Sequence, residues 1–300
     1  MLDDFAIFIL THGRADNVLT YRTLQRAGYT GRVYFVIDNE DKQAAQYYEN
    51  FGDKVIMFDK AAIAETFDEG DNFQDRRAVI YARNACFEIA ERLGIPYFMQ
   101  LDDDYTDFRY KMNGNNMYIN MAWIKDADTV IESLLNYYKS IDCVSLAVAQ
   151  GGDFIGGGGN DIHESVNRRR KAMNTFICAF DRKFDFVGRV NEDVNTYTSH
   201  QNKGNLFLTF PLVAIQQKET QKSDGGMSEM YLDSGTYIKS FYTVMYQPSS
   251  VHCAIMRSHH DERLHHQINW DRTVPCIISE DLRKASRTQA QSLASDSSLP

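Results

Sequence analysis

IPYFMQLDDDY, residues 95–105, begins as an apolar run and ends in three consecutive carboxylates, Asp102, Asp103 and Asp104. A short apolar run that is rich in aromatic residues is typical of a strand inside a sheet. Three acids cannot stay buried and ionised without partners, so the strand must reach the surface where they begin. Open α/β sheets bind ligands beyond the carboxyl ends of their strands. The stretch therefore predicts a ligand site, with a solvated acidic turn as the alternative.

Asp102 and Asp104 are two residues apart, so in extended geometry their side chains point to one side and Asp103 to the other. Carboxylate oxygens suit Mg²⁺ or Mn²⁺ better than zinc, and substrate phosphates commonly complete such a site. A nucleoside diphosphate is therefore the expected third component. Five of the eight histidines lie between residues 252 and 266. From this cluster we take His252 and His265 as candidate additional ligands, against the alternative that they are ordinary surface residues.

Three further apolar runs precede this stretch, at residues 5–10 (FAIFIL), 33–37 (VYFVI) and 54–58 (KVIMF). Helical patterns separate them, at residues 17–27, 42–51 and 76–93. Strands that alternate with helices predict an α/β fold with a Rossmann-like, mostly parallel sheet and helices on both faces. The first strand is followed by THGRADN and not by GxGxxG, which argues against a dinucleotide cofactor.

The rest of the chain continues the pattern of strands and helices. We expect a hairpin over residues 108–120, helices at 126–138, 194–200 and 228–241, strands at 143–149, 174–179 and 206–215, and strand-like pieces at Val244 and 251–256. Pro211 suggests that its strand lies at an edge or contains a bulge. We expect one domain over residues 1–281, with a nucleotide-binding half (1–104) and an acceptor half (105–281), and a disordered tail at 282–300.

Composition limits the class of protein. The chain of 300 residues is 43% hydrophobic and has a net charge of −9, which argues against nucleic-acid binding over its whole surface. No apolar run approaches a membrane span, and the acidic start MLDDF does not resemble a secretory leader. Five scattered cysteines without CxxC spacing read as thiols of a cytoplasmic protein. The one basic run is NRRRK, residues 167–171, and such a run is usually a solvated face.

Glu192 and Asp193 form an acid pair at the start of a predicted helix. A site that uses a diphosphate leaving group needs a base to take the proton of the acceptor hydroxyl, and this pair is the best candidate. Alternatively, the two acids only favour the helix macrodipole. Residues 151–159, GGDFIGGGG, predict a loop that approaches the substrate closely or a plain connector, and no GK[ST] of a phosphate-binding loop follows.

These patterns together resemble a glycosyltransferase of the GT-A fold. The similarity lies in the strand followed by THGR, in Asp38 after VYFVI, in Ala82-Arg83-Asn84, in the DxD-like LDDD and in the later acid pair of NEDV. The resemblance implies a metal-dependent transferase that uses Mn²⁺ or Mg²⁺ and an NDP-sugar donor, a UDP-sugar being favoured. It implies Asp193, with Glu192, as the catalytic acids and Asp102 and Asp104 as metal ligands. The implied nucleotide-sugar contacts are Thr11, His12, Arg14, Asp38, Arg83, Asp102 and Asp103.

A narrower resemblance rests on SVHCAIM and RLHHQINWDRTVP near the C-terminus. These segments are similar to the phage and TET-associated branch, which is thought to add sugars to hydroxymethylated pyrimidines in DNA. That branch implies a DNA acceptor, a role in DNA modification and, for a bacteriophage protein, the host cytoplasm. The basic residues that would meet DNA phosphates are Arg168, Arg169, Arg170 and Lys171.

Two alternatives remain at this point. One is another nucleotide-sugar enzyme, such as a nucleotidyltransferase, although THGRADN lacks the glycine- and lysine-containing loop which that class normally has. The other is a non-catalytic binding protein on the same fold. A thermal shift that requires both UDP and Mn²⁺ would favour the transferase, because ligands stabilise the state that binds them.

Overall fold

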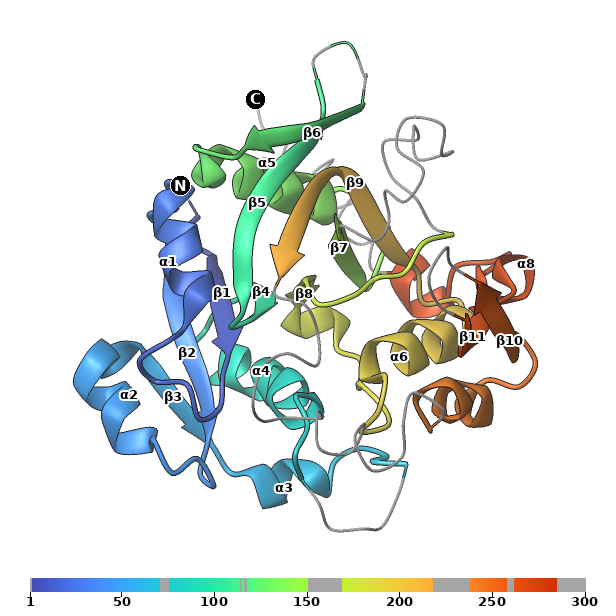
Figure 1. The fold of residues 1–300 in the computed structure, drawn as a ribbon, viewed down its shortest axis with the longest axis horizontal. Helices are drawn as coiled ribbons and strands as arrows, with labels where there is room; N and C mark the ends of the chain where they lie inside the picture. The colour runs from blue at the N-terminus through green and yellow to red at the C-terminus, as the bar shows by residue number, and fades with distance from the viewer. Residues whose placement is uncertain are drawn as a thin grey trace, which may run out of the picture.

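The structure is a computed structural model that describes residues 2–70, 76–113, 115, 118–150, 169–217, 238–257 and 262–284. Nine strands of the described chain form one sheet, in the order β3-β2-β1-β4-β8-β7-β9-β5-β6 (Figure 1). Their bounds are β1 Phe5–Leu10, β2 Val33–Asp38, β3 Val55–Phe58, β4 Tyr97–Asp102, β5 Tyr105–Met112, β6 Tyr118–Trp123, β7 Ser145–Gln150, β8 Phe176–Ala179 and β9 Phe207–Gln217.

The sheet is mostly parallel. β1 pairs in parallel with β2 and β4, β2 with β3, and β7 with β9, whereas β8 and β5 are antiparallel to their neighbours. Seven of these nine described strands therefore run in one direction, and β8 and β5 run in the other. The carboxyl ends of β2, β1, β4, β7 and β9 consequently lie along the same edge, and this edge also holds the start of β8.

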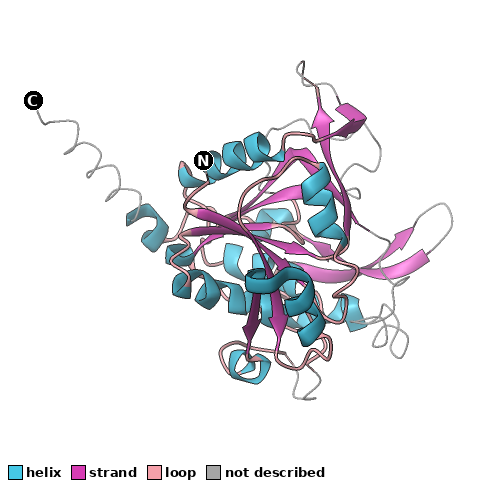
Figure 2. Cartoon of the chain, turned by 90° about the vertical axis from the view of Figure 1, so that its left-hand side faces the viewer, coloured by secondary structure: helices cyan, strands magenta, loops and turns pink. Residues whose placement is uncertain are grey.

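Helices cover both faces of the sheet (Figure 2). Their bounds are α1 Leu19–Arg26, α2 Ala44–Phe51, α3 Lys60–Ala64, α4 Ile80–Arg92, α5 Ala127–Lys139 and α6 Glu192–Gln201, with short 3-10 segments at Gly52–Lys54 and Phe180–Arg182. The sheet thus has a separate hydrophobic core on each face. Strand β1 contributes to both cores, because side chains alternate between the two faces of a strand. Phe5, Ile7 and Ile9 join the core under α1 and α5, and the residues between them join the core under α4 and α6. Continuous apolar runs are what a strand covered on both faces requires.

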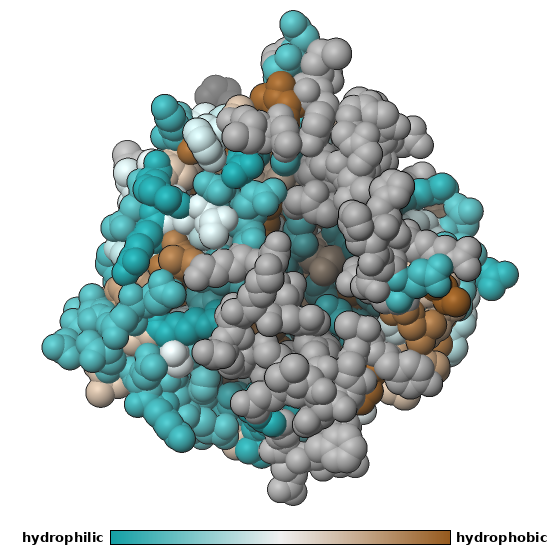
Figure 3. All heavy atoms as spheres, viewed as in Figure 1, coloured by the Kyte–Doolittle hydropathy of each residue, from teal (hydrophilic) through white to brown (hydrophobic). Residues whose placement is uncertain are grey.

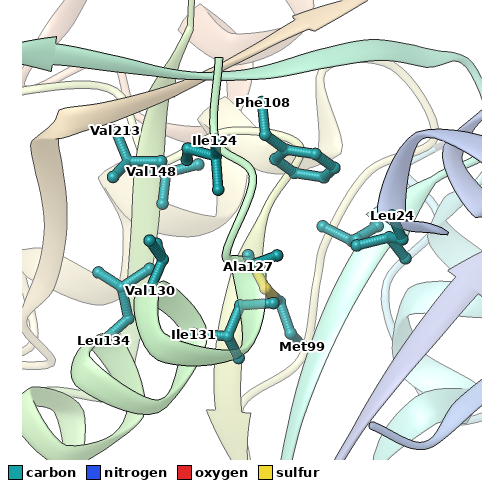
Figure 4. Close-up of a pocket in the computed structure, with 11 residues that line it drawn as sticks. Leu24, Met99, Phe108, Ile124, Ala127, Val130, Ile131, Leu134, Val148 and Val213 are labelled. Carbon is teal, nitrogen blue, oxygen red and sulfur yellow. The ribbon is translucent and has the colours of Figure 1, made fainter. Parts of the chain in front are cut away.

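The core under α1 and α5 contains one small cavity of about 20 Å³ (Figure 4). Aliphatic side chains, Met99 and Phe108 surround it, with Leu24 on the α1 side and Ile131 on the α5 side. A space of this size is close to that of one water molecule, but a water needs polar partners. The cavity is therefore a dry packing defect and not a ligand site.

Pro211 lies in a bulge, as one of the two sequence-based alternatives expected. The pairing of β7 with β9 passes from Val148↔Phe210 to Ala149↔Ala214, so β9 contains extra residues at this point. Proline has no N–H to donate to a ladder, which makes it compatible with such an irregularity. β9 bends here and continues as the neighbour of β5 (Figure 1).

A second sheet of two antiparallel strands, β10 (Val251–Arg257) and β11 (Glu262–Ile268), stands beside α6. Short helix α8 (Trp270–Thr273) follows, and Trp270 stacks on Tyr197 of α6 with ring centroids 5.9 Å apart. Residues 238–246 are helical, so the expected strand-like piece at Val244 is wrong. In the space-filling view, apolar side chains gather on the side of these strands, whereas the opposite side over α1 and α2 is hydrophilic (Figure 3).

The C-terminal boundary needs a correction. Residues 280–284 are helical, and Leu282 is buried against the core under α4 and α6. Ordered chain therefore extends beyond 281, because Leu282 finds an apolar surface that the local sequence does not reveal. The rest of the predicted tail lies outside the described residues. None of the helices in the described ranges has the length and apolarity to cross a membrane.

Candidate active site

A cleft of about 630 Å³ opens at the edge of the sheet where the parallel strands end. Topology creates it, because the loop after β1, Asp38 at the end of β2 and the acids at the end of β4 meet there, and α6 faces them. The predicted donor, metal-carboxylate and catalytic residues all line this cleft: Thr11, His12, Arg14, Asp38, Arg83, Asp102, Asp103, Asp104, Glu192 and Asp193. Positions as far apart in sequence as 11 and 193 thus form one site.

The acidic triplet forms a turn and not the extended segment that we expected. Asp102 is the last residue of β4, and Asp103 and Asp104 turn the chain into β5. Thr20 of α1 holds this turn, since its hydroxyl donates to the Asp102 carbonyl at 2.5 Å and its backbone N–H donates to the Asp103 carbonyl at 3.1 Å. Asp102 and Asp104 nevertheless both face the cleft.

Negative charge is concentrated at Asp102. Burial raises the pKa of this carboxyl group to about 7, even though Arg83 lowers it, and Asp104 and Glu192 raise it further. The side chain is still 24% exposed, so a ligand in the cleft can reach it. Excess carboxylate charge at an accessible point is what a bound cation would neutralise.

Asp103 has a different environment from its neighbours. Its carboxylate accepts hydrogen bonds from the Thr11 hydroxyl at 2.8 Å and from Arg14 Nη1 at 2.6 Å. The side chain is only 7% exposed. Asp103 therefore ties the turn after β4 to the loop after β1, and its direct contact with the donor stays a prediction. This contact also fixes the guanidinium of Arg14 at the wall of the cleft.

His12, Asp38 and Lys60 form a charged cluster where β1, β2 and β3 end. Asp38 Oδ2 lies 2.7 Å from His12 Nδ1, and Asp38 Oδ1 lies 3.4 Å from Lys60 Nζ. The hydrogen bond to Asp38 raises the pKa of His12 despite partial burial. The imidazole, which is 53% exposed, therefore offers positive charge to the cleft.

Arg83 of α4 connects the two acidic groups of the cleft. Its Nη2 donates to Asp102 Oδ1 at 2.9 Å, and its Nε donates to Glu192 Oε1 at 3.0 Å. The guanidinium is almost fully buried and lies over the rings of Phe176 and Phe186 at 5.1 and 5.7 Å. Burial acts to lower the pKa of Arg83, but Asp102 and Glu192 raise it overall. Arg83 thus stays charged and aligns β4 with α6.

Replacing Arg83 by Met is expected to lower the free energy of unfolding by about 3–5 kcal/mol, because it leaves two carboxylates beside a buried apolar group. Urea denaturation followed by circular dichroism measures this change. The matched control is Arg169→Met, which removes an ion pair with Asp271 whose side chains are 56% and 77% exposed. That pair should contribute less than about 1 kcal/mol. Equal effects of the two substitutions would contradict the role given to Arg83.

The acid pair lies in the first turn of α6. Asp193 is buried, and its Oδ1 accepts the Val194 N–H at 2.7 Å. Burial, followed by the charge of Glu192, raises the pKa of Asp193 to about 6, whereas Arg83 and Lys239 lower it. Asn191, in the left-handed conformation with φ of 57°, precedes the pair and donates to the Lys239 carbonyl at 2.6 Å. Asn191 therefore joins α6 to the helix at residues 238–246.

Several cleft residues were missed from the sequence: Lys60, Arg77, Gln150, Asn174, Asn191, Gln217 and Lys239. Lys60, Gln150 and Gln217 follow or end a strand, so the strand-end rule that found Asp38 and Asp102 applies to them as well. Asn174 lies before an antiparallel strand, and its position depends on strand order. No local pattern distinguishes Lys239 from other lysines.

Other predicted residues do not line the cleft. His252 and His265 lie on β10 and β11, where they pair with Gln267 and Ala254, respectively. Arg169 forms an ion pair with Asp271, and the backbone carbonyl of Lys171 accepts a hydrogen bond from the Thr209 hydroxyl. Arg168 and the glycine-rich loop at 151–159 lie outside the described residues. In the described part of the chain, no group of three or more His, Cys, Asp or Glu side chains could hold a metal ion by itself.

A mostly parallel α/β sheet, an acidic turn at the end of a central strand and an acid pair in the same cleft are the features expected of a glycosyltransferase of the GT-A type. The family model of TET-associated glycosyltransferases matches residues 5–226, and the chain belongs to this family. It is therefore an enzyme, and the alternatives of a nucleotidyltransferase and of a binding protein lose their support.

Among curated proteins, none matches the chain. Solved structures that are similar include glucosyl-3-phosphoglycerate synthase from Mycobacterium tuberculosis in complex with Mn²⁺, UDP and phosphoglyceric acid, with 7% identity, a TM-score of 0.44, and coverage of 94% of this chain and 90% of that chain. Another is mannosyl-3-phosphoglycerate synthase from Rubrobacter xylanophilus, with 10% identity, a TM-score of 0.40, and coverage of 88% of this chain and 86% of that chain.

Proposed function

We propose that the chain transfers a sugar from an NDP-sugar, with a UDP-sugar favoured, to the hydroxyl group of a hydroxymethylated pyrimidine in DNA. The main support for this proposal is that the acids at the end of β4 and the acid pair of α6 line one cleft. The family supports sugar transfer, and its name is consistent with a DNA acceptor. Residues 1–104 would supply most of the donor site and residues 105–281 most of the acceptor site, in a cytoplasmic enzyme.

Asp102 and Asp104 fit a Mn²⁺ or Mg²⁺ ion. Both face the cleft. Burial, and after it the charges of Asp104 and Glu192, raise the pKa of Asp102, and a bound cation would offset this cost of ionising it. Since two carboxylates do not complete the coordination shell of such an ion, the donor diphosphate and water would supply the remaining oxygens. When bound, the ion neutralises the charge that develops on the diphosphate leaving group. His252 and His265 lie off the cleft, so we do not include them among the ligands.

The loop after β1 would hold the nucleotide. Arg14 and the protonated form of His12 bring positive charge to this end of the cleft, which suits a diphosphate. Thr11, Asp38 and Asp103 would act mainly by fixing these groups, because their side chains already bond the loop or His12. Arg83 would hold Asp102 and Glu192 in place rather than bind the nucleotide.

Asp193 would act as the base of a single, inverting displacement. The acceptor oxygen forms a bond to the anomeric carbon of the sugar, and the bond from that carbon to the diphosphate oxygen breaks with its electron pair. The proton of the acceptor hydroxyl passes to Asp193. A carboxylate with a raised pKa is a better base near neutral pH than an ordinary aspartate. The basic run that includes Arg168, Arg169, Arg170 and Lys171 would meet DNA phosphates outside the cleft.

Intact mass analysis tests this function directly. Oligonucleotides with hydroxymethylcytosine or hydroxymethyluracil are incubated with the enzyme, a divalent cation and a panel of NDP-sugars. The expected result is a mass increase of one hexose or pentose for one donor. Unchanged masses with every donor, from a folded enzyme that binds NDP and cation, would refute the DNA acceptor but not the donor site.

The pH dependence of transfer is expected to follow Asp193. A base must be ionised to accept a proton, and burial with Glu192 raises the pKa of Asp193 to about 6. Activity should therefore be lost as the pH falls through about 6, by about tenfold per pH unit. Values of kcat/KM between about pH 5 and about pH 8, taken at saturating cation, measure this limb. A flat profile over that range would exclude Asp193 as the base.

A further inference from the structure

The edge of the sheet that forms the cleft changes in chemistry from one end to the other. At β2, β1 and β4 it is lined by charged groups, including Asp38, Arg14 and Asp102. At β8, β7 and β9 the described lining residues are Gln150, Met173, Asn174 and Gln217, and all four are uncharged. Gln217 at this end pairs with Tyr105 of β5, which directly follows the acidic turn. The uncharged end therefore lies beside the acidic turn, where a second substrate group would meet the donor.

Asn174 and Gln217 form a hydrogen-bonded amide pair at this end. Asn174 Nδ2 donates to Gln217 Oε1 at 2.7 Å. This pairing leaves the side-chain oxygen Oδ1 of Asn174 as an acceptor and the side-chain NH₂ group of Gln217 as a donor. A neutral pair with one acceptor and one donor side by side matches the hydrogen-bonding edge of a nucleobase. It matches a phosphate poorly, because a phosphate offers acceptors only.

The amide pair is also held in a fixed position relative to the acidic turn. The backbone N–H of Asp102 donates to the Tyr105 hydroxyl at 3.1 Å, and that hydroxyl donates to the backbone carbonyl of Asn174 at 2.6 Å. Tyr105 is fully buried and lies opposite Gln217 in the pairing of β5 with β9. Asn174 itself has a φ of 58°, a left-handed conformation that asparagine adopts more readily than most residues other than glycine. Backbone strain of this kind persists where the surroundings enforce it, and it is common at binding sites.

We propose that Asn174 and Gln217 read the base edge of the acceptor pyrimidine and so determine which acceptor the enzyme uses. The proposal rests on the proposed function, because it assumes a hydroxymethylated base in the cleft. A base must leave the duplex to enter such a site, and flipped bases are read by hydrogen bonds to this edge. Met173 supplies an apolar surface beside the pair, against which a ring can pack.

The test compares three single variants. Gln217→Met keeps the side-chain volume and removes the donor, and Asn174→Gly removes the amide but accepts the positive φ. Gln216→Met is the matched control, since neighbouring residues of a strand point to opposite faces and Gln216 does not line the cleft. The readouts are acceptor kcat/KM on hydroxymethylated oligonucleotides, and NDP binding with Mn²⁺ by calorimetry.

For Gln217→Met and Asn174→Gly we expect acceptor kcat/KM to fall by about 5- to 150-fold, the range for one bidentate base contact. NDP binding should equal that of the wild type, and Gln216→Met should leave both readouts unchanged. Unaffected acceptor kinetics in the two amide variants would overturn the inference alone. Weakened NDP binding in them would overturn it too, by assigning the pair to the nucleotide or to folding, and a raised KM for the NDP-sugar would overturn it by assigning the pair to the donor sugar. A wild-type enzyme that modifies no hydroxymethylated DNA would refute the proposed acceptor and this inference together.

Discussion

Replacement of Asp104 by alanine is expected to lower sugar transfer by about 100- to 1,000-fold, the usual loss when a group that stabilises developing charge is removed. Asp104 lines the cleft beside Asp102, and it is Asp102 whose carboxylate pairs with Arg83 at 2.9 Å. The substitution therefore removes a proposed cation ligand and leaves the ion pair between Asp102 and Arg83 in place. The rate of NDP release at NDP-sugar and Mn²⁺ concentrations that saturate the wild type measures this loss.

Asp107→Asn is the control for this substitution, because Asp107 lies in β5, pairs with Arg109 and does not line the cleft. It should keep wild-type turnover. Excess chelator should reduce the wild-type enzyme to the level of the Asp104 variant. Unchanged turnover in Asp104→Ala, or full activity in chelator, would exclude the metal role of the acidic turn.

Replacement of Asp193 by asparagine is expected to lower kcat by about 100- to 10,000-fold, since an amide cannot accept the proton of the acceptor hydroxyl. The change preserves the shape of the side chain and its carbonyl can still accept the Val194 N–H, so the start of α6 should keep its structure. NDP binding with Mn²⁺ should remain near that of the wild type. This combination separates loss of the base from loss of the donor site.

The exposed Asp181 provides the control Asp181→Asn, which should leave kcat unchanged. In the Asp193 variant, the loss of activity below about pH 6 should also disappear from the residual rate. Persistence of that limb would assign the titration to another group. Full activity of Asp193→Asn would remove the base from the mechanism.

Most of the donor side of the cleft could be predicted from the sequence. Buried parallel strands are visible as continuous apolar runs, and their carboxyl ends must meet at one edge of the sheet. Asp38 and Asp102 were found in this way, and the later pair Glu192 and Asp193 was found because two adjacent acids open a helix. These residues line one cleft because strand order near β1, and not detailed packing, brings them together.

The limits of the prediction have physical causes. Whether Asp103 points at a ligand or at Arg14 depends on a turn that replaces the expected extended geometry. The role of Arg83 depends on Glu192, 109 residues away, and no local pattern reveals such a contact. Asn174 reaches the cleft because β8 runs antiparallel between β4 and β7, which the sequence does not specify. Lys239 lies on a helix that is joined to the start of α6 by the hydrogen bond from Asn191 to the Lys239 carbonyl.

Titration calorimetry of nucleoside diphosphates into the enzyme tests the central claim most directly. Each of UDP, CDP, GDP, ADP and TDP is titrated with Mn²⁺, with Mg²⁺ and with chelator, into the wild type and into Asp104→Ala. We predict that one diphosphate, with UDP favoured, binds only when a cation is present, and that Asp104→Ala loses this binding. A wild-type affinity that is the same in chelator as with cation would contradict a metal-dependent donor site at the end of β4. So would an affinity of Asp104→Ala, with cation present, that equals that of the wild type.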